Sequence, residues 1–244
     1  MAEIYREQAA PEPLARWVEC LWWLETGDGI AGYPVAPDGC LDILYSLEGG
    51  LRVIGAMTAE RRFDLSPGSR TIGIRFLPGM AGSFLQAPPA ELTDRDAPLD
   101  DLWGARGREL ARRLAEARSA PEGLRLLAAA LRAPAHRPDV IGQAIEAITR
   151  SHGAIDLNAL ALRANLSPRQ FRRRCLEASG LAPKQLCRVM RFRHARQLAA
   201  RPGRLKWAQV SLEAGYYDQA HLIRDFRGFT GRAPGGPRLS ANTA

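Results

Sequence analysis

The 244-residue sequence lacks the features of an exported, membrane-spanning or metal-binding chain. Residues 1–13 are polar and contain proline, without the apolar stretch of a signal peptide. The longest aliphatic stretch, residues 124–131, is short and interrupted by Arg125, so no segment is expected to span a bilayer. The four cysteines form no C-x-x-C pair and no metal-ligand spacing. We therefore expect free thiols in a reducing cytoplasm and neither a metal nor a cofactor.

Histidine and lysine are scarce, and the positive charge is unevenly distributed. All four histidines lie after residue 135, which leaves the first half without an imidazole for a histidine-rich metal site. Residues 1–139 carry 16 Lys and Arg against 20 Asp and Glu, a net charge of −4, whereas residues 140–244 carry 18 against 6, a net charge of +12. This asymmetry favours a C-terminal half that contacts a polyanion over a merely solvated basic surface.

The first hundred residues are typical of short strands separated by turns. Aromatic and aliphatic segments at residues 17–24, 33–36, 40–45, 51–57 and 71–76 are separated by clusters of Gly, Pro and Asp. Helical patterns follow at residues 80–86, 106–117 and 124–131. We predict an α+β protein in which residues 1–137 form a small β-rich sensor or regulatory domain with accessory helices. Pro134 and Pro138 mark the expected hinge to an all-helical domain at residues 138–244.

The basic half contains an internal repeat. Residues 157–166 align with residues 207–216 at an offset of 50, and one extra residue in the second turn changes the offset to 51. Gly180 then aligns with Gly231 and Pro183 with Pro234, so the residues that end the helices coincide. Two short helices around a turn, repeated once, predict two helix-turn-helix units.

Each unit has the caps and the apolar face that two packed helices need. Ser167 and Asp218 are expected to cap the second helix of each unit. The residues expected to face inward share an apolar character: Leu157, Leu160, Ala161, Phe171 and Cys175 in the first unit, and Ala208, Val210, Leu212, Leu222 and Phe226 in the second. A helix over residues 184–200, ended by Pro202 and Gly203, would hold the units about one DNA turn apart, roughly 34 Å.

The outward faces of the two second helices carry residue types that recognise DNA. The predicted DNA-binding residues are Arg169, Gln170, Arg172 and Arg173 in the first unit and Gln219, Ala220, His221, Ile223 and Arg224 in the second. Arginine bonds bidentately to guanine and glutamine to adenine, and isoleucine can contact a thymine methyl group. His221 fits a phosphate contact and a role in closing the start of the helix equally well.

These segments resemble the AraC/XylS family of bacterial transcription regulators. The matching stretches are LSPRQFRR at 166–173, GYYDQAHLIRDF at 215–226 and GRAP at 231–234, within a resemblance that covers residues 141–238. The resemblance implies a seven-helix DNA-binding module that reads an asymmetric site, and its base contacts fall on Arg169, Arg172, Arg173, Gln219, Ala220, Ile223 and Arg224. Two departures are Cys175, where the family has a larger apolar residue, and Pro237-Arg238, where it has an aromatic residue before the arginine. They imply looser packing of the first unit and a short last helix.

The N-terminal half resembles the sensor domain of a subgroup of these regulators, on PDGCLDI at 37–43, GIRFLPG at 73–79, ELTD at 91–94 and residues 99–104. We predict an effector pocket with Trp22 and Tyr45 as walls and Asp38, Asp42 and Arg75 as polar anchors. The same residues also fit an ordinary core with a structural ion pair between Arg75 and Asp42.

The sequence therefore predicts a cytoplasmic, sequence-specific and effector-responsive transcription regulator with no catalytic residues. The predicted partners are double-stranded DNA, a small-molecule effector and, for an activator, RNA polymerase. A homodimer is compatible with the sequence, and a membrane is not an expected partner. One alternative is an architectural DNA-binding protein with little sequence preference, against which the outward Gln219 and Ile223 argue. Another is an alkyl-transfer repair enzyme that uses Cys40, but the chain lacks a cysteine cluster for zinc.

Overall fold

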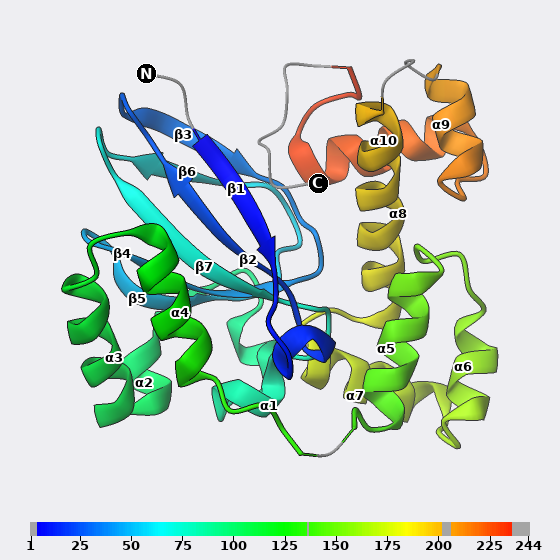
Figure 1. Ribbon diagram of the computed structural model, residues 1–244. Helices are drawn as coiled ribbons and strands as arrows, with labels where there is room; N and C mark the ends of the chain where they lie inside the picture. The colour runs from blue at the N-terminus through cyan, green and yellow to red at the C-terminus, as the bar shows by residue number, and fades with distance from the viewer. Residues whose placement is uncertain (1–3, 136, 202–205, 236–244) are drawn as a thin grey trace.

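The computed structural model describes residues 4–135, 137–201 and 206–235 and has the predicted α+β class. A curved sheet with accessory helices forms the N-terminal part, which packs against an all-helical C-terminal part (Figure 1). The strands are β1 (Ile4–Ala9), β2 (Val18–Glu25), β3 (Ile30–Val35), β4 (Leu41–Ser46), β5 (Gly50–Ile54), β6 (Arg61–Leu65), β7 (Arg70–Phe76) and β8 (Asp96–Pro98). The sequence patterns predicted β2, β3, β4, β5 and β7, but β1, β6 and β8 were not expected.

Most of the helices come after the strands along the chain. The short 3-10 helices are η1 (Leu14–Arg16) and η2 (Pro89–Leu92). The N-terminal α-helices are α1 (Gly82–Leu85), α2 (Leu99–Trp103), α3 (Ala105–Ala115) and α4 (Ala120–Ala130). The C-terminal α-helices are α5 (Val140–Arg150), α6 (Leu157–Arg163), α7 (Pro168–Ser179), α8 (Pro183–Ala200), α9 (Trp207–Glu213) and α10 (Gln219–Thr230). None of the described helices is both long and apolar enough to cross a membrane.

The main sheet is antiparallel in every pairing, with the strand order β1-β2-β7-β4-β5-β8. The strands β3 and β6 pair separately and lie over one face of this sheet (Figure 1). The helices α3 and α4 contact the sheet through β5, β7 and β2, and they lie on its other side. Because successive side chains of a strand point to opposite faces, every strand divides its residues between two environments.

The alternation in β4 shows this division. Leu41, Ile43 and Tyr45 are buried in the large hydrophobic cluster. Asp42 and Leu44 instead line a cavity on the side of β3 and β6. The large cluster continues from the N-terminal part into the C-terminal helices, and it includes fully buried side chains from both, such as Phe76 and Phe192. The two parts of the chain therefore share one continuous core.

The C-terminal helices are arranged around α8. This helix contacts α5, α7, α9 and α10, and buried side chains occur along its whole length. The helices α6 and α9 lie on the same side of α8, away from the sheet (Figure 1). The predicted helix over residues 184–200 thus corresponds to α8, whereas its expected stop at Pro202 and Gly203 lies outside the described residues, as do Pro237 and Arg238.

Gly73 is the position where the sheet leaves no room for a side chain. Gly73 pairs with Trp22 across β7 and β2, and an added Cβ atom would lie 2.4 Å from Cε2 of the Trp22 indole. We expect Gly73→Ala to lower the free energy of unfolding by about 1–3 kcal/mol, because the indole must be displaced from a packed site. Urea unfolding of the purified chain measures this change.

Gly228→Ala is the matched control, since Gly228 lies in α10 and the nearest heavy atom to an added Cβ is Nη2 of Arg188 at 3.7 Å. This variant should be neutral or more stable by up to about 1 kcal/mol, because alanine favours the helix. Equal stability of the Gly73→Ala variant and the unaltered chain would show that the indole is not held where the packing places it.

Candidate functional site

The helix pairs α6–α7 and α9–α10 repeat the same hydrogen bonds. In the first turn the Leu166 amide donates to the Ala161 carbonyl at 3.0 Å, and in the second the Tyr216 amide donates to the Ser211 carbonyl at 2.9 Å. The two donor residues are 50 positions apart in the sequence, and so are the two acceptor residues. Each turn passes through one residue with a left-handed backbone, which is Asn165 in the first and Gly215 in the second. The predicted duplication is therefore present in the backbone.

The start of each second helix shows where the extra residue lies. The Ser167 side chain caps α7 by accepting from the Gln170 amide, and the Asp218 side chain caps α10 by accepting from the His221 amide. These bonds are related by an offset of 51, so the insertion falls between residues 216 and 218. Tyr217, which is 88% exposed, is the additional residue. Both predicted N-caps are confirmed.

The ends of α7 and α10 are also equivalent. Each helix stops at a left-handed glycine, Gly180 or Gly231. In the residue before it, the Ser179 hydroxyl donates to the Cys175 carbonyl and the Thr230 hydroxyl donates to the Phe226 carbonyl, both at 2.8 Å. Because both ends are fixed by the same bonds, α7 and α10 are built on a common frame, as expected of two recognition helices.

The outward faces of α7 and α10 are open to solvent. Exposed side chains at the predicted positions are Arg169, Gln170, Arg172 and Arg173 on α7 and Gln219, Ala220 and Arg224 on α10. Ile223 and His221 are half-buried, and the His221 ring lies 5.1 Å from the Tyr216 ring. Two of the predicted residues have partners within their own helix: Gln170 completes the capping box with Ser167, and Arg173 pairs with Glu177 at 2.9 Å.

The apolar faces of the first helices were predicted less well. Leu160, Ala161 and Val210 are buried as expected, but Leu212 is 70% exposed and Ala208 is also exposed. These two predictions were wrong because Ala208 and Leu212 each lie two positions from Val210, about 200° around the helix, and so point away from the side that α9 buries against α8 and α10. Cys175, expected to loosen the first unit, is fully buried.

The helix α8 fixes the two units relative to one another. Its Arg188 donates to Oδ1 of Asp225 on α10, at 3.0 Å from Nε and 2.7 Å from Nη2. The Phe192 ring lies 4.8 Å from the Phe226 ring and 4.9 Å from the Phe229 ring. This ion pair, in which only Asp225 is buried, restricts the rotation of α10 about α8 together with the aromatic packing.

The N-terminal part contacts the C-terminal ends of both second helices. The Thr93 hydroxyl donates to the Gly180 carbonyl at the end of α7, at 2.7 Å. The Glu60 amide donates to the Phe229 carbonyl in the last turn of α10, at 2.6 Å. The Glu60 carboxylate also forms an ion pair with Arg232, directly after α10. We call the Thr93 contact with α7 and the Glu60 contacts with the end of α10 the helix-end clamp.

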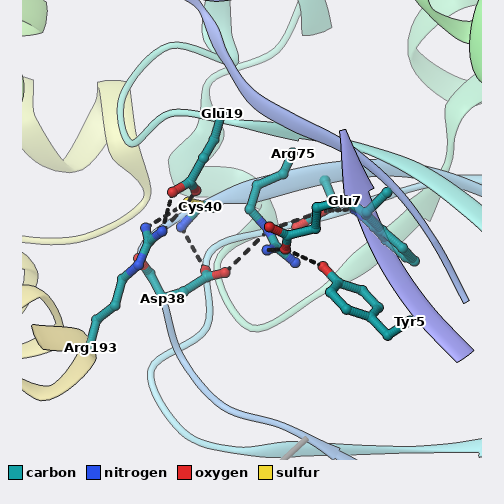
Figure 2. A network of polar contacts seen from close by, with 9 residues as sticks. Tyr5, Glu7, Glu19, Asp38, Cys40, Arg75 and Arg193 are labelled. Atoms are coloured by element: carbon teal, nitrogen blue, oxygen red, sulfur yellow. Dashed lines mark hydrogen bonds and ion pairs between the residues drawn. The ribbon is translucent and has the colours of Figure 1, made fainter. Parts of the chain in front are cut away.

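A third contact reaches the middle of α8. Arg193 on α8 forms an ion pair with Glu19 on β2, and the Cys40 thiol donates to the other oxygen of Glu19 at 3.1 Å (Figure 2). The Cys40 amide donates to Asp38 at 2.9 Å, and Asp38 lies 3.3 Å from Nε of Arg75. These residues form a continuous polar network from α8 to the inside of the sheet.

Arg75 is the centre of this network. Its side chain is 4% exposed, and it lies 3.3 Å from Glu7 and 3.5 Å from Asp42 in addition to Asp38. Burial lowers the pKa of the Arg75 guanidinium, but the neighbouring carboxylates Asp42 and Asp38 raise it well above its usual value, so the side chain stays charged. A buried arginine with several carboxylates is a stable arrangement only while its partners remain in place.

A cavity of about 230 Å³ lies between the main sheet and the β3–β6 pair. Asp42 and Arg75 line its inner end, together with Trp22, whose Nε1 donates to Oδ1 of Asp42 at 2.6 Å. The remaining walls are largely apolar and aromatic, with Tyr5, Tyr33 and Phe63 among them. The cavity therefore combines apolar walls with a few convergent polar groups, which is the usual composition of a small-molecule site.

The structure brings together three of the five predicted pocket residues. Trp22, Asp42 and Arg75 line the cavity, and Asp38 contacts Arg75 from behind without lining it. The prediction for Tyr45 was wrong. It lies three positions after Asp42 on the same strand, so it points to the opposite face, toward Leu114 and α4. Sequence reasoning missed Tyr5, Tyr33 and Phe63, because β1 and β6 were not recognised and the partner of β3 was therefore unknown.

Burial affects the acids and thiols of this region. It raises the pKa of Asp42 to about 6, against the opposing effect of Arg75. Burial, with the nearby Asp38 and Glu19, also raises the pKa of the Cys40 thiol well above its usual range. Cys40 is therefore a poor nucleophile, which removes the basis of the alkyl-transfer alternative. Among the residues that the structure describes, no group of His, Cys, Asp and Glu is arranged to hold a metal ion.

The ion pair between Glu19 and Arg193 should contribute to stability in a pH-dependent way. Burial raises the pKa of Glu19, but the charge and hydrogen bond of Arg193 outweigh it, so the pKa lies below its ordinary value of 4.5. The stabilisation is therefore present above about pH 4.5 and is lost as the pH falls below it. We expect Glu19→Gln to lower the free energy of unfolding at neutral pH by about 3 kcal/mol, because Arg193 is left buried without its partner.

Urea unfolding at several pH values tests this expectation, and the difference from the unaltered chain should narrow below about pH 4.5. Glu25→Gln is the control, since Glu25 forms an exposed pair with Arg70 and its loss should cost no more than about 1 kcal/mol. A Glu19→Gln effect as small as the control's would mean that the contact with α8 is not energetically important.

Two family models match the chain. One, described as a helix-turn-helix domain, matches residues 160–238, and the other, a domain of unknown function named DUF6597, matches residues 6–98. No curated protein matches the chain.

Solved structures that match include domains and whole chains. The DNA-binding domain of AdpA, in complex with a target DNA, is 28% identical, with a TM-score of 0.36, and the match covers 40% of this chain and 87% of that domain. A DNA-binding transcriptional dual regulator from Escherichia coli K-12 is 22% identical, with a TM-score of 0.35 and coverage of 42% and 91%. ToxT from Vibrio cholerae is 10% identical, with a TM-score of 0.43 and coverage of 94% and 96%.

The family matches agree with the paired motifs at residues 166–173 and 215–226 and with the duplicated backbone around them. The chain accordingly contains an N-terminal DUF6597 domain and a C-terminal helix-turn-helix domain of the AraC type.

Proposed function

We propose that this regulator recognises a specific DNA sequence by inserting α7 and α10 into two successive major-groove segments of one duplex. The observation that carries the proposal is that both helices have the same capped frame and leave their outward faces exposed. They are joined by α8, whose 18 residues span roughly 27 Å at 1.5 Å per residue. With the helix radii included, this length suits two recognition helices one DNA turn apart.

The residue types on the two faces support sequence recognition. Arg169, Arg172 and Arg173 on α7 suit guanine edges and phosphates, and Gln219, Ala220, Ile223 and Arg224 on α10 suit a mixed site with adenine, thymine and guanine. Gln170 and His221 are held near the helix starts, by the capping box and by Tyr216, and are better placed for backbone contacts. A protein that only follows phosphates would need basic residues alone, so this mixture favours a specific regulator over an architectural protein.

Competition between operator and random DNA tests this proposal. Genomic fragments bound by the purified chain would first be sequenced to obtain an operator. Its affinity would then be compared with that of a random duplex at the same salt concentration. A specific regulator should prefer its operator by about 1,000-fold or more, whereas an architectural protein should bind both about equally.

We further propose that residues 1–137 sense an effector and that residues 138–244 read the DNA. The route would be the three contacts described above: the helix-end clamp at α7 and α10, and the network through Arg193 to the middle of α8. An effector in the cavity beside Arg75 would touch one end of that network. Glu19 is bonded to α8, Glu60 to the residue Arg232 after α10, and Thr93 to the end of α7. An effector that moves Glu19 or Glu60 would therefore alter the orientation of α10 relative to α7.

The remaining partners follow from this function. A regulator of this kind would act in the cytoplasm, and an activator would contact RNA polymerase. A second copy of the chain would be a partner on operators with two adjacent sites.

Arg173→Ala and Arg224→Ala should each weaken operator binding by about 1–3 kcal/mol and relax the base preference at one position. The reason is that each removes a bidentate donor from an exposed recognition face. Fluorescence anisotropy with operator and random duplexes measures both effects.

Arg112→Ala is the control for these two variants, because it removes the same charge from an exposed site on α3 in the N-terminal part. It should leave the ratio between operator and random DNA unchanged. If Arg173→Ala and Arg224→Ala weakened both duplexes equally, these arginines would be phosphate contacts and not base contacts.

Glu60→Gln should weaken operator binding by about tenfold, although Glu60 is not on a recognition face. The substitution removes the ion pair that holds Arg232 at the end of α10. Loss of a negative charge would by itself favour DNA binding, so a weaker complex identifies the clamp as the cause.

Glu48→Gln removes the same charge from the exposed turn between β4 and β5 and should not weaken binding. Both variants can be compared with the unaltered chain by anisotropy on the operator. Unchanged affinity for Glu60→Gln would exclude the ion pair between Glu60 and Arg232 as part of a route between the two parts.

A further inference from the structure

The cavity between the main sheet and the β3–β6 pair has aromatic walls on several sides. Tyr5 and Trp22 come from the main sheet, and Tyr33 and Phe63 come from the smaller pair. The Tyr5 and Trp22 rings lie 6.1 Å apart. Aromatic faces attract cations as well as apolar groups, most strongly where water is excluded. The walls alone thus admit a neutral or a cationic ligand.

The charges at the inner end distinguish between these ligands. Three carboxylates, Glu7, Asp38 and Asp42, lie within 3.5 Å of one guanidinium, that of Arg75. Glu7, Asp38, Asp42 and Arg75 together carry a net charge of about −2 when all four are ionised, and Arg193 and Arg196 of α8 offset part of it through Asp38. A buried excess of negative charge is unfavourable unless a counter-charge approaches it.

The cations of the cavity are already paired, which argues against an anionic ligand. Arg75 is surrounded by carboxylates, and Arg52 donates to Asp96 from both Nε and Nη2, at 2.8 and 2.5 Å. Arg61 bonds the other oxygen of Asp96 at 2.8 Å. A carboxylate ligand would have to displace one of these pairs and add to the negative charge of the inner end.

Asp42 is the group best placed to receive a cation. It lines the cavity, and in the described part of the chain its contacts with Trp22 and Arg75 both use Oδ1, so Oδ2 can accept a further bond. Burial, with Asp38 and Glu19 nearby, raises its pKa to about 6 against the opposing effects of Arg75 and the Trp22 hydrogen bond. A cation bound beside Asp42 would stabilise the ionised form of this carboxylate and so counteract the increase in its pKa.

We propose that the cavity binds a small monocation with an aromatic or apolar body, an amine in its protonated form, with the ammonium group at Asp42 and the body between the aromatic walls. This inference rests on the proposed effector-responsive function, for which it names the chemical class of the effector. The volume of about 230 Å³ limits the ligand to roughly the size of a single ring with a short side chain.

The occupied site would also act on the polar network. An ammonium group at Asp42 competes with Arg75 for that carboxylate, so Arg75 would depend more on Asp38. Asp38 is the residue that binds the Cys40 amide next to Arg193 (Figure 2). The ligand would thus act at the start of the path to α8.

Calorimetric titration of the full chain without DNA tests the ligand class with three probes of one shape: 2-phenylethylammonium, 2-phenylethanol and 3-phenylpropanoate. The ammonium should bind about tenfold or more tightly than the alcohol, because only the ammonium has a counter-charge for Asp42 and a cation for the aromatic faces. The propanoate should bind more weakly than the alcohol, since it meets the negative end of the cavity.

Two variants locate the effect. Asp42→Asn keeps an oxygen for Trp22 but removes the charge, and it should reduce ammonium binding to about the level of the alcohol. Asp64→Asn is the matched control, because Asp64 also lines the cavity but is exposed, and its loss should change the affinity by no more than about twofold. Thermal unfolding of each variant checks that it folds, and the probe series on the unaltered chain stands independently of both.

The pH dependence gives a second readout. Ammonium affinity should fall by about tenfold between pH 7 and pH 5, because Asp42, with a pKa of about 6, must first release a proton. The affinity for the alcohol should not follow this trend. Equal or tighter binding of the alcohol or the propanoate, or no binding of the ammonium at millimolar concentration, would overturn the proposal.

The operator titration separates this inference from the proposed function. Selective ammonium binding that leaves operator affinity unchanged would support the ligand class and contradict effector-responsive regulation. Sequence-specific operator binding by a chain that does not bind the ammonium would contradict only the ligand class.

Discussion

The packing around α8 is the constraint on which the other contacts depend. Most surface helices bury one stripe, but α8 has buried side chains on several faces, from Leu186 and Val189 to Phe192 and Ala195. It must fit α5 and α7 at one end, α9 and α10 at the other, and the N-terminal part through Met190 and Arg193. Closely packed protein interiors transmit displacements rather than absorbing them. A helix with neighbours on every side therefore couples them mechanically.

This coupling explains why the two parts of the chain share a core. Separate domains usually meet through a polar, replaceable surface. Here Gly39 lies so close to Met190 that an added Cβ would be 2.6 Å from its terminal methyl group, and Gly79 is similarly close to Ile145. The two stretches at residues 37–43 and 73–79 therefore each place a glycine against a C-terminal helix, Gly39 against α8 and Gly79 against α5.

The sequence predicted the C-terminal part well because its signals are local. Caps such as Ser167 and Asp218 and stops such as Gly180 and Gly231 act within one turn of the helix they delimit, so they can be read without knowing the tertiary structure. The α+β class was predicted from local signals as well, namely the clusters of Gly, Pro and Asp that separate the strand and helix patterns. Two errors were local as well and could have been avoided. Leu212 was placed with Val210 although two positions on a helix lie about 200° apart. Tyr45 was placed with Asp42 although strand alternation separates positions three apart, and this error was avoidable.

Other features could not have been found in the sequence. The strand β6 is exposed at every second position and short, and only its pairing with β3 makes it recognisable. The contacts of Glu60, Thr93 and Glu19 with the C-terminal helices join residues 87 to 174 positions apart, and no local pattern distinguishes these three polar residues from solvated ones.

The position of Glu60 restricts how this regulator could have diverged by exchange of domains. Its side chain is only 7% exposed and lies between Arg62 of its own part and Arg232 of the other. A hybrid that joined this N-terminal part to the helix-turn-helix part of a relative without a basic residue at that position would bury the carboxylate beside a single exposed arginine. An exchange of domains that keeps the chain stable would therefore have to transfer Glu60 and Arg232 together, so the two parts are expected to be inherited as a unit.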